Sequence, residues 1–262
     1  MLLSRGANLT LVIVGLGLTG WVTQPLSVPA WAEVRASEPA LQVRSLDASL
    51  GQGFTLGLFG GFRAVIADFL WLETNSLWEQ KDLPATQTMI NAVVTADPRP
   101  LYFWINGARM IAYDMPFWRY EAAGGMDRIS AEARHRIDEE QAWAALGFLD
   151  RGLEAHPREP LLLVEIANIH LRRRNDPMTA AAYYRLAAEQ PHAPYYAARI
   201  YAAVLKRLGQ PRAAYDWLCR IYPTLPAGDP MAMASVVLAQ IRDLEEELRI
   251  PADDRFELGT RP

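Results

Sequence analysis

The segment LVEIANIHLRRRNDPMTAAAYYRLAAEQP, residues 163–191, is followed by a second segment of similar design, ARIYAAVLKRLGQPRAAYDWLCRIYPTLP, residues 198–226. In each segment, apolar residues recur at spacings of three and four, which is typical of amphipathic helices. Each segment also contains an internal turn signal, Asn175-Asp176-Pro177 in the first and Gly209-Gln210-Pro211 in the second. The two segments therefore each predict two helices joined by a tight turn.

The pattern has an internal period. Pro157, Pro191 and Pro226 are 34 and 35 residues apart, and a set of alanines that precede these prolines, Ala145, Ala180 and Ala214, repeats at 35 and 34. Small residues also recur in the first helix of each segment, at Ala167 and Ala202, and after Pro98 at Ala108. A fixed period of this length indicates stacked supersecondary units.

This pattern resembles the tetratricopeptide repeat (TPR), in which a large residue, a large–small pair, a turn glycine and an Ala-x-x-x-large motif precede a proline. The resemblance covers roughly residues 64–245. It implies an all-α fold, a right-handed α-solenoid of TPR-like helix pairs, in which each pair buries its apolar face against the next. A generic helical bundle with the same spacing is the alternative.

The periodicity predicts helices throughout a repeat domain at 53–250, listed here as 61–80, 84–96, 100–113, 130–155, 160–173, 177–189, 194–208, 211–222 and 230–248. Pro98 and Pro157 are 59 residues apart, more than one period. We therefore expect an insertion at about 113–138, around Pro116 and Gly124-Gly125. Residues 251–262 are polar and are expected to form a loose tail.

The N-terminus carries an export signal. Arg5 precedes an apolar run from Leu9 to Val22, and Ala30-Trp31-Ala32 forms a small-x-small site. This arrangement predicts a signal peptide at 1–32, cleaved after Ala32. No charge occurs from Gly6 to Ala32, so an uncleaved membrane anchor stays open, because about 20 apolar residues span a bilayer. Residues 33–52 would then be a linker. In both cases the body lies on the non-cytoplasmic side, either periplasmic or anchored to the membrane.

Composition and motifs argue against several classes of function. The net charge of −4 does not favour a nucleic-acid binder. The four histidines and the single cysteine show no metal-ligand spacing, and the Gly15–Gly20 glycine motif lacks the strand–helix–strand context of a cofactor site. The acidic runs 138–140 and 245–247 are expected to be solvated. We therefore predict no enzyme activity, no metal and no cofactor.

The resemblance implies that the first helix of each pair lines a concave face. Some TPR proteins hold a partner's terminal carboxylate there with Lys, Arg and Asn, although only Asn168 and Arg199 fall at similar places. Ordinary surface charge is the alternative for these cations. A second expected anchor is Phe117 with Trp118, beside Pro116, in the insertion. The candidate partner-binding residues are Arg109, Tyr113, Phe117, Trp118, Asn168, Arg172, Arg199, Lys206 and Arg207.

The sequence therefore predicts a non-catalytic scaffold outside the cytoplasm, which binds a partner protein through its concave face. One alternative is a structural subunit of a membrane-associated complex, and a remote one is an exported enzyme on a helical frame. The segment Gly60–Leu72 is similar to the opening helix of some exported bacterial TPR-like proteins. It is expected to be either a buried cap or a surface that contacts a membrane or a partner subunit.

Overall fold

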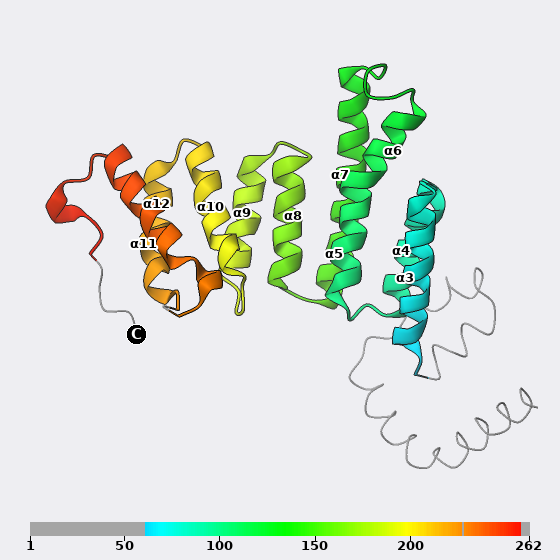
Figure 1. Ribbon diagram of the computed structural model, residues 1–262, viewed down its shortest axis with the longest axis horizontal. Coiled ribbons are helices and arrows are strands. Elements are labelled where there is room, and N and C mark those ends of the chain that lie inside the picture. Colours follow the sequence, from blue (N-terminus) through cyan, green and yellow to red (C-terminus); the bar gives the residue numbers. More distant parts are fainter. Residues whose placement is uncertain (1–60, 227, 258–262) are drawn as a thin grey trace, which may run out of the picture. The chain divides into compact units, whose positions relative to one another are not determined.

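The computed structural model describes residues 61–226 and 228–257, and throughout this part the protein is helical without a β-strand (Figure 1). The chain divides into two compact units, 1–51 and 52–262, and every described residue belongs to the second. The all-α prediction is confirmed for this part. The predicted signal peptide or anchor and the linker lie outside the described residues.

The helices follow the predicted order. The α-helices are α3 (Arg63–Glu79), α4 (Leu83–Ala96), α5 (Leu101–Arg109), α6 (Met115–Ala122), α7 (Ala131–Ala155), α8 (Pro160–Arg172), α9 (Pro177–Ala188), α10 (Tyr195–Arg207), α11 (Pro211–Ile221) and α12 (Ala234–Glu247). A π-helical turn, η2 (Met110–Asp114), joins α5 to α6, and short 3₁₀ turns are η3 (Tyr222–Thr224), η4 (Pro230–Ala232) and η5 (Ala252–Asp254).

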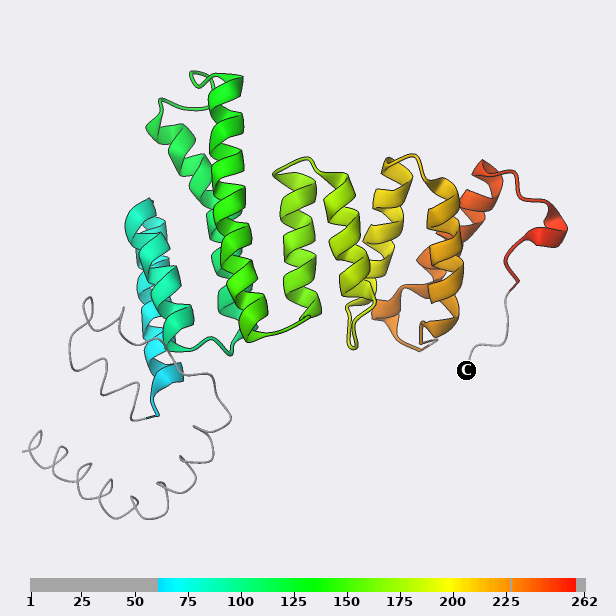
Figure 2. The ribbon, with the colours of Figure 1, turned by 180° about the vertical axis from the view of Figure 1, so that it is seen from behind.

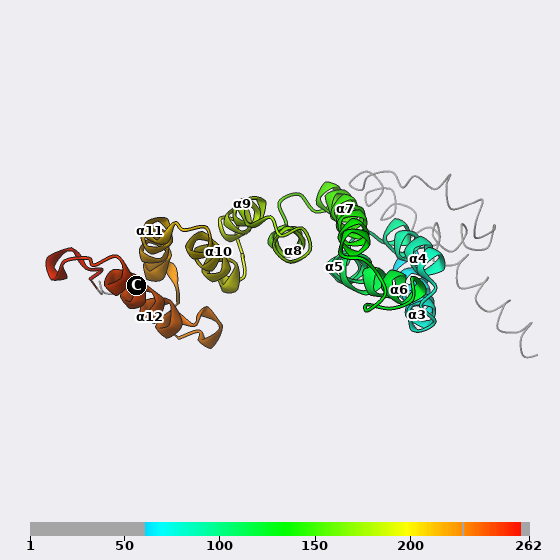
Figure 3. The ribbon, with the colours of Figure 1, turned by 90° about the horizontal axis from the view of Figure 1, so that it is seen from above.

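Helices that are neighbours in sequence are also neighbours in space (Figures 2 and 3). The helices pack pairwise, α3 on α4, α5 on α7, α8 on α9 and α10 on α11, and α12 packs on α11. Each pair also contacts the next through α4 and α5, α7 and α8, and α9 and α10. Burial therefore comes mainly from elements close in sequence.

Small residues lie at the helix contacts, as the periodicity predicts. The six alanines of the repeat pattern are all buried, namely Ala108, Ala145, Ala167, Ala180, Ala202 and Ala214. Between α10 and α11, Gly209 has a φ of +71°, a left-handed conformation that glycine adopts without steric cost. The turn is closed by Gln210 N–H, which donates to Leu205 O at 2.9 Å.

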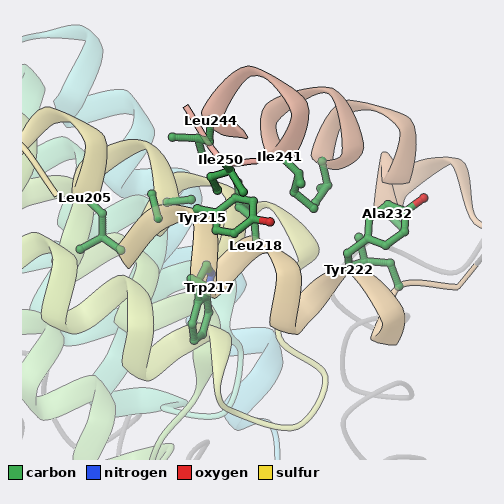
Figure 4. Close-up of a cluster of buried hydrophobic side chains, with 13 residues drawn as sticks. Leu205, Tyr215, Trp217, Leu218, Tyr222, Ala232, Ile241, Leu244 and Ile250 are labelled. Atoms are coloured by element: carbon green, nitrogen blue, oxygen red, sulfur yellow. The ribbon is translucent and has the colours of Figure 1, made fainter. Parts of the chain in front are cut away.

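Buried apolar side chains of α10, α11 and α12 form a core cluster in the C-terminal part of the described chain. Leu205, Leu218, Ile241 and Leu244 meet there, and Ile250 follows them after the end of α12 (Figure 4). At roughly 1.5–3 kcal/mol for each fully buried large apolar side chain, this cluster is a main source of stability in the last helices.

The first part of the insertion differs from the prediction, because Met115–Ala122 is helical where no helix was expected. The helix that begins as α5 continues through η2 into α6, and α7 has 25 residues, about 37 Å at 1.5 Å per residue. Met115 N–H donates to Met110 O in the π-turn. Directly after this shift in hydrogen-bond register, Pro116 lies in the first turn of α6, the part of a helix that tolerates proline best. The inserted residues therefore lengthen one helix pair.

The C-terminal segment also differs from the prediction. Glu245 is 0% exposed, although the run 245–247 was expected to be solvated. Its carboxylate accepts hydrogen bonds from Arg242 at 2.9 and 2.8 Å and from Phe256 N–H at 2.8 Å. The Phe256 ring lies edge-on to Tyr222, 5.5 Å between centroids. The segment expected to be loose from Pro251 is therefore attached to α12 as far as Phe256.

Candidate functional site

A pocket of about 300 Å³ lies between the α5–η2–α6 helix and α8. The spacing of the lining residues along each helix places their side chains on the faces that border the pocket. Arg109 and Tyr113 are four residues apart, while Glu165, Asn168 and Arg172 lie three and seven residues apart on one face of α8. Four of the predicted site residues therefore come together. The lining residues are Arg109, Tyr113, Asp114, Glu165, Asn168 and Arg172.

A buried carboxylate organises this pocket. Glu165 is 2% exposed, and its Oε2 accepts hydrogen bonds from Arg109 Nε at 3.2 Å and Nη2 at 3.0 Å and from Asn168 Nδ2 at 3.3 Å. Asn168 Oδ1 accepts in turn from the Tyr184 hydroxyl at 2.6 Å. The hydrogen bond to Glu165 raises the pKa of Arg109. The network holds Arg109 and Asn168 in fixed positions, since a buried charge needs its partners.

Arg172 is the exception in this network. It is exposed at the end of α8, and its guanidinium forms no hydrogen bond or ion pair with the residues that the structure describes. Burial raises the pKa of Tyr184 to about 12, and the positive charge of Arg172 opposes that rise. Arg172 therefore adds positive charge and planar hydrogen-bond donors to the pocket.

The other three predicted cations have partners within the chain. Arg199 Nη1 donates to Ala232 O at 3.2 Å, Lys206 Nζ lies 2.9 Å from Glu247 Oε2, and Arg207 Nη2 donates to Asn175 Oδ1 at 2.8 Å. They do not line the pocket. Their present role is to connect α10 to η4, α12 and the α8–α9 turn.

Phe117 and Trp118 do not act as one pair. Phe117 is 48% exposed, whereas Trp118 is buried against Trp78, with an edge-to-face contact of 6.3 Å between ring centroids. Trp78 Nε1 also donates to Asp114 Oδ2 at 2.8 Å. Because both residues belong to helix α6, adjacent side chains point in different directions. Only Phe117 is available to a partner.

The acidic run 138–140 is only partly solvated as expected, because Glu140 is exposed whereas Asp138 and Glu139 are half-buried, and all three form ion pairs. Arg173 donates to Asp138, Arg174 Nε lies 3.3 Å from Glu139, and Arg119 Nη2 lies 2.6 Å from Glu140. These ion pairs connect the lengthened α7 to its neighbours.

His170 is packed within the fold. Its ring is buried and stacks on Tyr183, with 5.6 Å between centroids. Burial lowers the pKa of His170, which favours the neutral ring.

Within residues 61–226 and 228–257, no cluster of three His, Cys, Asp or Glu residues is arranged to hold a metal ion. In the same range, no helix is both long enough and apolar enough to cross a membrane. Comparison with protein-family models, with curated proteins and with solved structures gave no match.

The carboxylate at the centre of the pocket, Glu165, was not among the site residues predicted from the sequence. Glu165 is the single charged residue in the apolar run 160–169. An isolated acid inside such a run indicates a buried carboxylate that needs a cationic partner. Arg109, 56 residues earlier, could not have been identified as that partner from spacing alone.

Proposed function

We propose that this protein is an exported, non-catalytic scaffold, a TPR-like α-solenoid whose concave face binds a partner protein. The observed packing of helix pairs in sequence order supports the proposal. So does the period, since α8 begins at Pro160 and α10 at Tyr195, 35 residues further along. The export signal predicted for residues 1–32 from their sequence favours a periplasmic or membrane-anchored location.

The observation that carries the proposal is the unpaired guanidinium of Arg172 beside a preorganised pocket. Glu165 already neutralises Arg109, and the remaining carboxylate of the pocket, Asp114, accepts a hydrogen bond from the Trp78 indole. The cation left for a ligand is therefore Arg172. A guanidinium donates two parallel hydrogen bonds to a carboxylate, and Asn168 lies in the same pocket to add a polar contact. The partner segment would therefore carry an acidic group that enters between η2 and α8.

A structural subunit of a membrane-associated complex is the second candidate. It is favoured by one observation, the large apolar side chains that α3 exposes, including Phe69 and Leu72. In that case the surface would be covered by a neighbouring subunit.

The first prediction concerns Arg172→Glu. The partner is first isolated by affinity purification on the full chain from the native membrane fraction and then titrated against the parent and the variant. A lost charge-assisted hydrogen bond is worth roughly 1.5–3 kcal/mol, so we expect about ten- to a hundredfold weaker binding. The melting temperature should not change, because Arg172 is exposed.

Arg136→Glu is the matched control, since Arg136 is an exposed arginine on α7 outside the pocket. It should bind as the parent does in the same salt. Equal affinities for all three proteins would remove the pocket from the binding surface. Equal losses in both variants would indicate non-specific charge attraction instead.

A further inference from the structure

The first described helix carries an exposed apolar stripe. Phe62, Val65, Phe69 and Leu72 are 62%, 48%, 68% and 63% exposed, respectively. They are three or four residues apart, so they lie on one face of α3 over about 15 Å. Large apolar side chains that line up on a surface in this way mark an interaction site.

The stripe is not the face that α3 uses within the fold. Ala67, Trp71 and Thr74 are the buried residues of the helix, and they lie on the side that packs on α4. Trp71 contacts Phe103 with 5.4 Å between ring centroids. The expectation of a buried first helix therefore holds for one face only, and the opposite face has no cover among the described residues.

The borders of the stripe are acidic. At 3.6 residues per turn, Asp68 lies along one side of it and Glu73 along the other, and Glu79 follows on the Asp68 side beyond Leu72. All three are exposed, and none forms an ion pair with the described residues. The cation of this helix, Arg63, is directed to α4, where its Nε donates to Ala96 O at 3.3 Å. The stripe therefore presents apolar contacts between two negative edges.

We propose that this face of α3 docks an amphipathic helix of another protein, one whose apolar stripe is bordered by Lys or Arg. The charge pattern selects this occupant. A second copy of the chain would place acidic borders against acidic borders, and an anionic lipid surface would be repelled by the same carboxylates. A basic-bordered helix gains apolar burial and complementary charge together.

The test uses the full chain, immobilised, and a displayed library of 18-residue amphipathic helices. The apolar stripe of the library is constant, and its border positions vary among Lys, Glu and Gln. We expect enrichment of Lys at the borders. Selected peptides should bind Phe69→Glu at least tenfold more weakly than the parent.

Two controls keep the test specific. Met178→Glu changes another exposed apolar residue, on α9, and should bind as the parent does. Asp68→Lys with Glu73→Lys should reverse the selected border from Lys to Glu. Because these exposed positions are far from Arg172 in sequence and on another element, the Arg172→Glu measurement is independent of this one.

Three outcomes would overturn the proposal. The first is a failed selection: no peptide is enriched, the enriched peptides show no preference at the border positions, or they bind Phe69→Glu as tightly as the parent. Another is sedimentation of the parent, but not of Phe69→Glu, with phosphatidylcholine or mixed phosphatidylglycerol vesicles, which would assign the face to a membrane. The third is self-association in sedimentation equilibrium that Phe69→Glu abolishes, which would assign it to a second copy.

Discussion

At the scale of single residues, Glu245 shows how position in the fold decides the role of a charge. It is one of three consecutive glutamates, yet it is enclosed by Arg242, Tyr215 and the backbone of Phe256, whereas Glu246 beside it is exposed. Burial alone would raise the pKa of Glu245, but the hydrogen bonds from Arg242 and Phe256 N–H hold it below its ordinary value of 4.5.

The second prediction follows from this pKa. A carboxyl group whose pKa is lower in the folded state stabilises the fold above its ordinary pKa, and the contribution is lost as the pH falls through the folded value. Glu245→Gln should lower the free energy of unfolding by about 1–3 kcal/mol at pH 7. The difference from the parent should shrink as the pH falls below 4.5. Denaturant unfolding over a series of pH values measures both effects.

Glu246→Gln is the control, because it removes an equal charge from an exposed neighbouring position. If it changed stability as much as Glu245→Gln, the buried network would not be the cause. A difference between parent and Glu245→Gln that did not depend on pH would contradict the assigned direction of the pKa shift.

At the scale of elements, two glycines in helices have opposite surroundings. A Cβ on Gly107, in α5, would lie 2.8 Å from Ile90 Cγ2 and 3.1 Å from the Phe148 ring, whereas a Cβ on Gly147, in α7, would meet nothing within 4 Å. Gly107 therefore marks a close approach between α5, α4 and α7. Gly147 carries only the entropic cost of a glycine in a helix.

The third prediction uses this contrast. Gly107→Ala should destabilise the protein by about 1–3 kcal/mol, because the branched Ile90 side chain cannot move aside without strain. Gly147→Ala should stabilise it by roughly 0.5–1 kcal/mol through helix propensity. Parallel denaturant melts of the two variants measure the difference. Stabilisation by both substitutions would contradict the close approach of α4, α5 and α7 at Gly107.

The same elements show what the sequence could predict. The recurring alanines, prolines and Gly209 predicted most helices to within a few residues, because these residue types act through local sterics. The continuous helix through Met110–Ala122 was not predicted. Pro116 predicted a break in the helix, whereas the chain continues through a π-turn, for which there is no reliable sequence signal.

At the scale of the whole molecule, stacking of successive helix pairs depends on a few tight contacts. Ala202 in α10 is 3% exposed and belongs to the core shared with α11 and α12, whereas Ala203 beside it is exposed. The two alanines have the same helix propensity and differ in what surrounds them.

The fourth prediction compares Ala202→Trp with Ala203→Trp. Overpacking a filled contact costs about 1–3 kcal/mol, so Ala202→Trp should lower the melting temperature by several degrees. Ala203→Trp should leave it nearly unchanged. Calorimetry or circular dichroism on both variants measures this. An unchanged melting curve for Ala202→Trp would count against the repeat register.

The candidate site was predictable only where it depends on one helix. Asn168 and Arg172 share a face of α8 by their spacing alone, and Arg109 and Tyr113 follow in the same way. The pairing of Arg109 with Glu165, and of Lys206 with Glu247, joins residues more than 40 positions apart. Such contacts depend on how neighbouring pairs stack, which a repeat period does not specify.

The lengthened pair formed by the α5–η2–α6 helix and α7 has a consequence for how the chain can vary. Both of its helices grow at the same end, and the chain still enters at Leu101 and leaves at Ala155 beside α8. If equal numbers of residues were added to or removed from both helices near Gly124-Gly125, the length of this helix pair would change. The packing of the helix pairs that follow it would stay the same. The lengthened pair is therefore a place where exposed surface could be gained or lost without a change in the packing of the other helix pairs.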